Sequence, residues 1–326
     1  MEYTITEESF NSLTSYWNNP KQNLRWNTIF VLPVWLQVWW QVFGDGAELY
    51  LRAVRQGEKI IGIAPLVIRD EAASIIGGTD TCDYLDFVVV PGMEKDFLTA
   101  LLDDLRQKGI NQLDLSPLRP DSAMFNDFIA IAQNQKCDAS CKLEDVSLEI
   151  DLPPTWDEYL GILTGKQQHE VERKLRRLWR LGDVGYHIVE DKAVAHDLMG
   201  TFLNMFSVSR EEKANFMTAR MKTFFISIAD TMAEAGFLKL GILELDSLPA
   251  AMVLCFDYDD CVYLYNSGYD PHYSSLSVGL LSKVLLIKDS IQKGRKKFDF
   301  LKGGESYKYQ LGGREVPIYN CRIMLK

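Results

Sequence analysis

The chain has 326 residues, a length that fits two domains. Its formal net charge of −10 argues against general nucleic-acid binding, which requires a basic face, but does not exclude a local basic site. A hydrophobic fraction of 47% is enough for buried cores, and no apolar run reaches the ~18 residues that predict a membrane-spanning helix. The acidic first residues do not resemble a secretory leader, so we expect a cytoplasmic protein without a membrane span.

The cysteines and histidines predict no metal centre. Cys137 and Cys141 have a CxxxC spacing, but no second pair and no histidine cluster completes a zinc site. The four histidines are isolated and form neither a Ser-His-Asp order nor an HxxE pattern. We therefore expect the six cysteines to be free, mostly buried thiols in a reducing compartment, and we expect no bound metal.

Hydrophobic periodicity and turn residues predict helices around a mainly antiparallel sheet in the N-terminal half. The first two strands form a hairpin through Gln56-Gly-Glu-Lys59. The predicted helices cover residues 35–43, 94–108 and 121–133, and the predicted strands cover 49–55, 60–68, 87–90, 112–115 and 143–150.

A second unit is predicted to begin where Pro153 and Pro154 interrupt the chain before an N-cap at Thr155. The predicted domains are therefore 1–150 and 151–326. The predicted helices of the second cover 155–164, 166–181, 193–208, 216–235 and 278–292, and its strands cover 185–190, 237–245, 250–258, 261–269, 297–301 and 316–324. The expected fold class is α/β (α+β), with two units that each contain a mixed, mainly antiparallel sheet flanked by helices.

A turn of small residues precedes the predicted helix 278–292. Backbone N–H groups at the start of a helix are unpaired and carry partial positive charge. Ser275, Ser277 and Gly279 are small enough to let a pyrophosphate approach, so the strand–turn–helix order predicts an anion-binding site. The alternative is an ordinary helix start that Ser275 or Ser277 caps.

Acidic, aromatic and lysine side chains alternate around two glycines in Phe298-Asp-Phe-Leu-Lys-Gly-Gly-Glu-Ser-Tyr-Lys308. Glu305 is a candidate base and Tyr307 a candidate proton donor for acyl transfer. Lys308 is a candidate for binding an anionic substrate or a developing oxyanion, and Asp299 is a candidate substrate contact. The alternative is a strand that ends in a Gly-Gly turn, with Asp299 paired to a lysine and Tyr307 in the core.

Two further clusters are candidate substrate-binding residues. Asp83, Tyr84 and Asp86 follow a Gly-Gly turn at a strand entry, and the alternative there is a loop with solvated acids and a core tyrosine. Arg173 and Arg177 lie on a basic stripe of the predicted helix 166–181, which could attract a phosphate or an anionic glycan. The alternative is a solvated face that neighbouring glutamates balance in part.

The order of these motifs resembles that of GNAT-superfamily acyltransferases of the cellulose-biosynthesis (CelD/BcsL-like) type, which are related to the FemABX aminoacyl transferases. The resemblance covers nearly the whole chain, is strongest at residues 298–308, and implies tandem GNAT-like domains with the acyl donor in the second. It implies that the donor lies along the predicted strand 261–269 and the turn after it. The donor-binding residues would be Asn266, Tyr269, Tyr273, Ser275, Ser277, Val278 and Gly279.

The resemblance implies an acyl-CoA-dependent N- or O-acyltransferase with acetyl-CoA or another acyl-CoA as co-substrate. Transfer would be direct, to an amine or hydroxyl of a sugar, glycan precursor or amino compound, as in polysaccharide biosynthesis. One alternative is an aminoacyl-tRNA-dependent transferase of the FemABX type, for which tRNA would be a partner. The other is a non-catalytic, degenerate GNAT module that binds a ligand.

Overall fold

The computed structural model describes residues 3–125, 128–209 and 211–325 of the chain. The chain forms two compact units. The N-terminal unit is Met1–Val146 together with Val316–Lys326, and the C-terminal unit is Ser147–Glu315. The last strand thus returns to the N-terminal unit, whereas the expected second domain, 151–326, included it.

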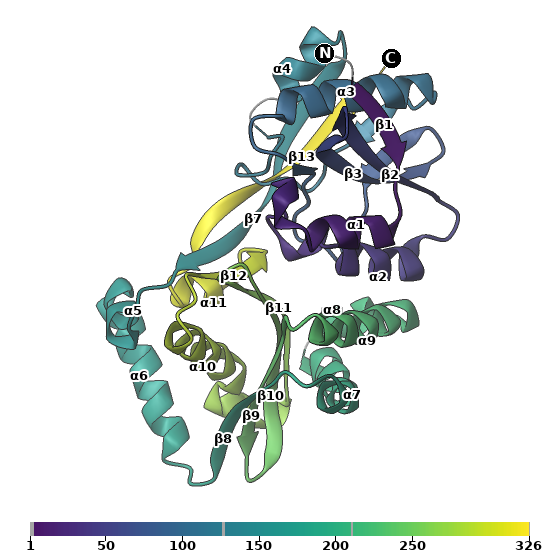
Figure 1. Cartoon of the computed structure of the whole chain (residues 1–326). Coiled ribbons are helices and arrows are strands. Elements are labelled where there is room, and N and C mark those ends of the chain that lie inside the picture. Colours follow the sequence, from purple (N-terminus) through teal and green to yellow (C-terminus); the bar gives the residue numbers. More distant parts are fainter. Residues whose placement is uncertain (1–2, 126–127, 210, 326) are drawn as a thin grey trace. The chain divides into compact units, whose positions relative to one another are not determined.

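The N-terminal unit is built on a mixed sheet in the order β1-β2-β3-β4-β6-β13. The β4–β6 pair is parallel, and the other pairs of known register are antiparallel. Figure 1 shows α3 on one side of strands β1 to β3 and α1 with α2 on the other. The elements are β1 (Tyr3–Glu7), α1 (Phe10–Trp17), α2 (Pro33–Phe43), β2 (Glu48–Gln56), β3 (Lys59–Arg69), β4 (Ala72–Ile75), β5 (Val88–Val89), α3 (Glu94–Gln107), β6 (Gln112–Asp114), α4 (Phe128–Asn134), β7 (Asp138–Asp151) and β13 (Arg314–Met324).

Close packing of α3 on β3 depends on Gly62. A Cβ at this position would lie 2.3 Å from Cδ2 of Phe97, well inside van der Waals contact. Glycine has no Cβ, so the helix can approach the strand at this point. The Gly62-Ile-Ala-Pro-Leu66 phrase is therefore a packing feature of β3, and all five of its residues are buried.

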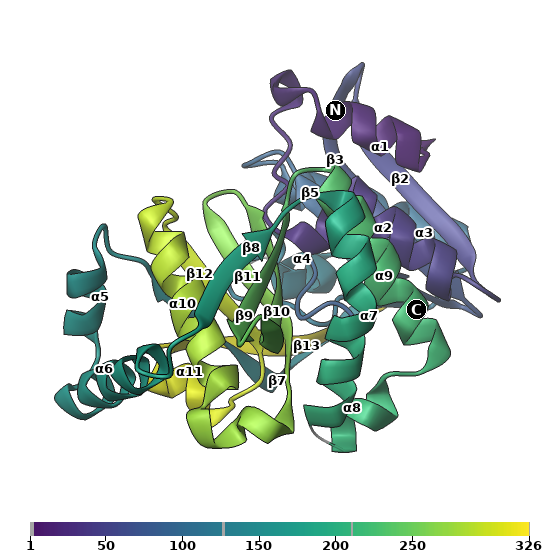
Figure 2. The same ribbon diagram turned by 90° about the horizontal axis from the view of Figure 1, so that it is seen from below.

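The C-terminal unit contains the sheet order β7-β12-β11-β10-β9-β8, in which the end of β7 forms one margin. Figures 1 and 2 show α7 and α9 on one face of this sheet and α10 with α6 on the other. The elements are α5 (Trp156–Ile162), α6 (Gly165–Trp179), β8 (Val184–Val189), α7 (Lys192–Ser209), α8 (Glu211–Phe216), α9 (Ala219–Glu234), β9 (Leu238–Leu245), β10 (Leu248–Tyr258), β11 (Cys261–Tyr269), η3 (Pro271–Leu276), α10 (Val278–Gln292), β12 (Lys297–Lys302) and α11 (Ser306–Gln310).

Strand β11 carries a bulge and separates from its neighbour. Leu254 of β10 pairs with Asn266, but the next residue, Cys255, pairs with Leu264, so Tyr265 is the extra residue. Among the described residues, β11 pairs with the parallel strand β12 only over Cys261–Tyr263. The second half of β11 therefore has an edge that β12 does not cover, next to the turn that leads into α10.

The expected fold class is confirmed: both units are α/β, with mainly antiparallel sheets flanked by helices. The predicted helix 278–292 and the predicted strand 261–269 have the observed bounds. Helices α1, α8 and α11 and strands β1 and β4 were not predicted. Of the predicted helix 121–133, residues 126 and 127 lie outside the described residues, and α4 begins at Phe128.

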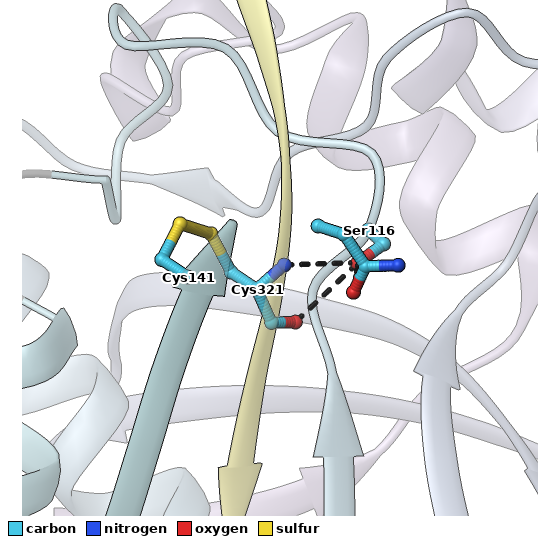
Figure 3. The surroundings of a disulfide bond; sticks show 4 residues. Ser116, Cys141 and Cys321 are labelled. Atoms are coloured by element: carbon cyan, nitrogen blue, oxygen red, sulfur yellow. Dashed lines mark hydrogen bonds between the residues drawn. A yellow bond between two sulfur atoms is a disulfide. The ribbon is translucent and has the colours of Figure 1, made fainter. Parts of the chain in front are cut away.

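The expectation of free cysteines is wrong for two of them. Cys141 of β7 and Cys321 of β13 form a disulfide across 180 residues of sequence, while the remaining four cysteines are free and buried. Figure 3 shows Ser116 beside this bond, where its Oγ accepts the Cys321 N–H at 3.0 Å and donates to the Cys321 carbonyl at 3.4 Å. The CxxxC spacing therefore does not reflect a metal site, because Cys141 pairs with the last strand.

Among the described residues, none of the helices combines the length and the apolarity needed to cross a bilayer. The same residues contain no group of three or more His, Cys, Asp or Glu side chains arranged to bind a metal ion.

Candidate functional site

The start of α10 presents two unpartnered N–H groups. Ser277 adopts a left-handed conformation (φ 59°) that ends η3 and begins α10, and its side chain does not cap the helix. The N–H groups of Leu280 and Leu281 both donate to the Ser277 carbonyl. Those of Val278 and Gly279 have no acceptor within the described residues. This helix start therefore offers two donors, and the expected alternative of a serine cap is not what the structure shows.

Tyr269 joins the end of β11 to this helix start. A Cβ at Gly279 would lie 3.0 Å from Cδ1 of the Tyr269 ring, so the tyrosine lies directly against the glycine. The ring also belongs to an apolar cluster with Tyr273 and buried residues of α10. Asn266 lies next to the bulge and is partly buried. The edge of β11 that β12 does not cover and the first turn of α10 are thus neighbours.

The basic helix α6 packs against the same turn. Leu178 of α6 is buried in the cluster that contains Val278 and Tyr273. Arg177 donates from Nη1 to the carbonyl of Ser275 at 3.3 Å, which brings a guanidinium to the loop before α10. An arginine beside two free N–H groups is a suitable arrangement for a phosphate.

Arg173, one turn earlier on α6, is paired differently. It forms two hydrogen bonds of 2.9 Å to the carboxylate of Glu170. These bonds lower the pKa of Glu170 to about 2. The two arginines of the basic stripe therefore differ, because Arg173 pairs along its own helix and Arg177 reaches the loop.

The segment 298–308 forms a turn around two buried charged residues, Asp299 and Lys308. Asp299, with 1% of its surface exposed, accepts the Leu301 N–H at 2.7 Å, which stabilises Leu301 in a left-handed conformation (φ 64°). Lys308, with 2% exposed, donates from Nζ to the carbonyls of Leu301 at 2.9 Å and Lys302 at 2.6 Å. It also forms an ion pair of 2.9 Å with Glu305. These contacts bind Lys308 to the backbone of the turn.

Tyr307 and Glu305 face less confined surroundings. The Tyr307 ring packs edge-on against Phe300, with ring centroids 6.3 Å apart. The ammonium of Lys283 lies 4.9 Å from the centroid of the Tyr307 ring. The Glu305 side chain is 45% exposed, so a reactant could reach its carboxylate.

The Asp83-Tyr-Leu-Asp86 segment lies in the N-terminal unit and is largely buried. Tyr84 packs edge-on against Phe30, with centroids 5.2 Å apart, beneath the Arg119 guanidinium. Asp86 accepts the N–H groups of Phe87 at 2.8 Å and Ala123 at 2.9 Å. Burial nevertheless raises the pKa of Asp86 to about 7. Asp83 is the partly exposed member of the three.

Asp86 is expected to make the stability of the N-terminal unit depend on pH. An unfolded Asp has a pKa of about 3.9, so between about pH 4 and 7 the folded chain retains a proton that the unfolded chain has lost. Its contribution is greatest below pH 4 and falls as the pH rises to 7. Between pH 5 and 7, the free energy of unfolding of wild type, measured in urea, should fall by about 2 kcal/mol more than that of Asp86→Asn. Parallel curves for the two proteins would contradict this.

Two lysines of the C-terminal unit are not among the residues predicted from the sequence. Lys283 of α10 is only 6% exposed, and Lys213 of α8 donates to the carbonyl of Ser267 on β11 at 2.6 Å. The apolar run around Lys283 offered a signal, because a lysine amid leucines on a helix that is buried on most sides needs a partner. Lys213 lies in a short polar helix that gave no such signal.

Comparison with known proteins places these features in context. Residues 165–309 match the family model described as "Acetyltransferase (GNAT) domain". The match runs from α6 to α11 and includes every candidate of the C-terminal unit. This unit resembles GNAT acetyltransferases. A search of curated proteins gives no significant match.

Solved structures with similar folds cover most of the chain at low identity. FemX has a TM-score of 0.67 at 12% identity, over 97% of this chain and 96% of its own. A conserved protein of unknown function from Bacteroides thetaiotaomicron has a TM-score of 0.59 at 12% identity, over 99% and 100%. L-PGS from Bacillus licheniformis has a TM-score of 0.54 at 10% identity, over 89% and 90%. These likenesses show the fold, and the family match adds support for a transferase.

Proposed function

We propose that the protein is an acyl-CoA-dependent N- or O-acyltransferase whose donor site lies in the C-terminal unit. The observation that supports this most is the start of α10, where Val278 and Gly279 offer free N–H groups. This helix start lies against Tyr269, which ends β11 on the edge that β12 does not cover. A donor with a pyrophosphate and a long, narrow arm matches an anion site beside an open strand edge.

In this proposal the pyrophosphate binds the two N–H groups, with Arg177 alongside. The arm lies along the open edge of β11, past Asn266 and Tyr269. Tyr273, Ser275 and Ser277 shape the loop that leads to the helix. Gly279 lets the Tyr269 ring lie directly against the start of α10, because any side chain there would meet that ring.

Direct transfer would use the carboxylate of Glu305, just before α11, and the phenol of Tyr307 on it. The acceptor nitrogen or oxygen attacks the thioester carbon, so a C–N or C–O bond forms and the C–S bond breaks. The acceptor loses a proton, for which exposed Glu305 is the proposed base, directly or through water. The departing thiolate gains one, for which Tyr307 is the proposed donor. Asp299 and Lys308 are proposed to stabilise the turn that carries both, in place of the expected substrate contacts.

The proposed acceptor is a sugar, a glycan precursor or an amino compound, as in CelD/BcsL-like acyltransferases that contribute to polysaccharide biosynthesis. We place the reaction in the cytoplasm, where acyl-CoA is available. Asp83 is the member of the Asp83-Tyr-Leu-Asp86 segment proposed for acceptor binding, because Tyr84 and Asp86 are buried.

The two arginines of α6 test the donor site. We expect Arg177→Gln to weaken CoA binding about fivefold, because it removes a charged phosphate partner beside the loop. Arg173→Gln should change it less than about twofold, because Arg173 is already paired with Glu170 on an exposed surface. Calorimetric titration of both variants measures the difference. If the two substitutions changed the affinity for CoA equally, Arg177 would not be a residue of the donor site.

A second candidate is an aminoacyl-tRNA-dependent transferase of the FemABX type. The similarity in fold to FemX over nearly the whole chain favours it, as does the contact between a basic helix and the donor loop. A tRNA donor predicts binding that weakens steeply with salt. It also predicts that Arg173→Gln and Arg177→Gln both weaken tRNA binding, whereas CoA does not bind. Filter binding of charged tRNA at two salt concentrations therefore separates the two donors.

A further inference from the structure

A buried lysine lies between the start of α10, in the proposed donor site, and the proposed proton donor Tyr307. Lys283 is in the second turn of α10, and its side chain is 6% exposed. Its Nζ donates to the carbonyl of Gly279 at 2.6 Å, back along the helix. The same ammonium lies 4.9 Å from the centroid of the Tyr307 ring on α11. One cation therefore contacts both the first turn of α10 and the aromatic ring of the proposed proton donor.

Removing the Lys283 ammonium from water costs free energy, which favourable contacts must offset. An ammonium in an apolar interior is unfavourable unless hydrogen bonds or other favourable contacts compensate it. Lys283 also acts on Cys255 of β10: burial raises the pKa of that thiol, and the nearby ammonium opposes the rise. The cation therefore lies inward, between α10 and the sheet. An apolar residue would fill the same position without this cost.

The geometry restricts the Tyr307 ring on two sides. The ring faces the Lys283 ammonium and packs edge-on against Phe300 at 6.3 Å. A cation over an aromatic face is an attractive contact whose strength increases when water is excluded. Tyr307 lies on α11, a helix of five residues that follows a Gly-Gly turn.

We propose that Lys283 is a positioning residue that orients the Tyr307 phenol toward the leaving thiolate and couples it to the first turn of α10. This inference rests on the proposed function. Lys283 contacts Gly279 and Tyr307 rather than the reacting atoms, so it acts through them. A group that acts through Tyr307 should have no further effect once the phenol is removed.

Kinetics in two backgrounds test this coupling. Lys283→Gln keeps a donor for the Gly279 carbonyl but removes the charge, and Lys283→Met is a second variant in case the first does not fold. Either should lower kcat with acetyl-CoA about tenfold, with little change in donor KM. In a Tyr307→Phe background the same substitution should change kcat less than about twofold. An equal loss in both backgrounds would overturn the inference.

A second readout does not require turnover. With tyrosine labelled at Cζ with 13C, the Tyr307 resonance is the one missing from Tyr307→Phe. Lys283→Gln should shift it, Lys283→Arg should shift it less, and Lys288→Met should leave it in place, because Lys288 lies instead over Trp156. An unmoved resonance in Lys283→Gln overturns the positioning role. If wild type turned over no acyl-CoA, the proposed function would be overturned. The Tyr307 resonance would still show whether Lys283 contacts the Tyr307 ring.

Discussion

Lys308→Met is expected to destabilise the C-terminal unit by about 2–5 kcal/mol, since each buried polar group left without a partner costs about 1–3 kcal/mol. The substitution leaves the carbonyls of Leu301 and Lys302 without their ammonium donor and breaks the ion pair with Glu305. The turn that positions α11 should then lose its order. Chemical denaturation followed by tryptophan fluorescence measures the loss, and activity should fall with it.

Lys296→Met is the matched control for this prediction. Lys296 is exposed and lies six residues before Lys302 on the same segment, so its loss should change stability by less than about 0.5 kcal/mol. If Lys308→Met were as stable as Lys296→Met but inactive, Lys308 would act on the substrate, as its sequence position first suggested. If Lys308→Met were as stable as Lys296→Met and fully active, Lys308 would neither stabilise the turn nor act on the substrate.

Tyr307→Phe is expected to lower kcat about 10²-fold or more, because positioned proton transfer contributes about 10²–10⁴-fold to such reactions. The phenyl ring retains its packing on Phe300 and its contact with Lys283, so folding and donor affinity should not change. Steady-state kinetics with acetyl-CoA, combined with calorimetric donor binding, separates the chemical step from binding.

Tyr309→Phe provides the comparison on the same short helix. Its hydroxyl contacts Glu315, and its side chain is exposed, so removal of that hydroxyl should change kcat less than about twofold. Similar losses in the two variants would show that α11 is sensitive to any change. If Tyr307→Phe kept the wild-type kcat, the phenol would not be the proton donor, and water would protonate the departing thiolate instead.

The sequence predicts the scaffold of the site better than its chemistry. Helix α10 and strand β11 have the expected bounds because an apolar helical run and a short apolar, aromatic-rich strand run are bounded by clear turn signals. Helix α11 was missed because one turn of helix after Gly303 and Gly304 has too few residues to show a period. The bulge at Tyr265 was missed because it depends on register with β10.

The roles of charged residues are harder to predict because burial is not visible in the sequence. Lys308 stands in a polar stretch typical of a surface loop, and Asp299 stands in a predicted strand, but both are almost fully buried and bonded to the turn. For Lys283 the apolar neighbours indicate burial, but the sequence does not show that its partner is the ring of Tyr307. The bond between Cys141 and Cys321 depends on strands that lie 180 residues apart in sequence.

Calorimetric titration of CoA and acetyl-CoA tests the central claim most directly. We predict micromolar binding to wild type. Gly279→Glu should weaken it more than about tenfold, because its carboxylate repels the pyrophosphate and competes for the N–H groups of the α10 start. Gly279→Ala adds a Cβ that only presses on the Tyr269 ring, so its affinity for CoA should stay within about threefold of wild type. Failure of CoA to bind wild type, or equal binding by all three proteins, would contradict a donor site at this helix.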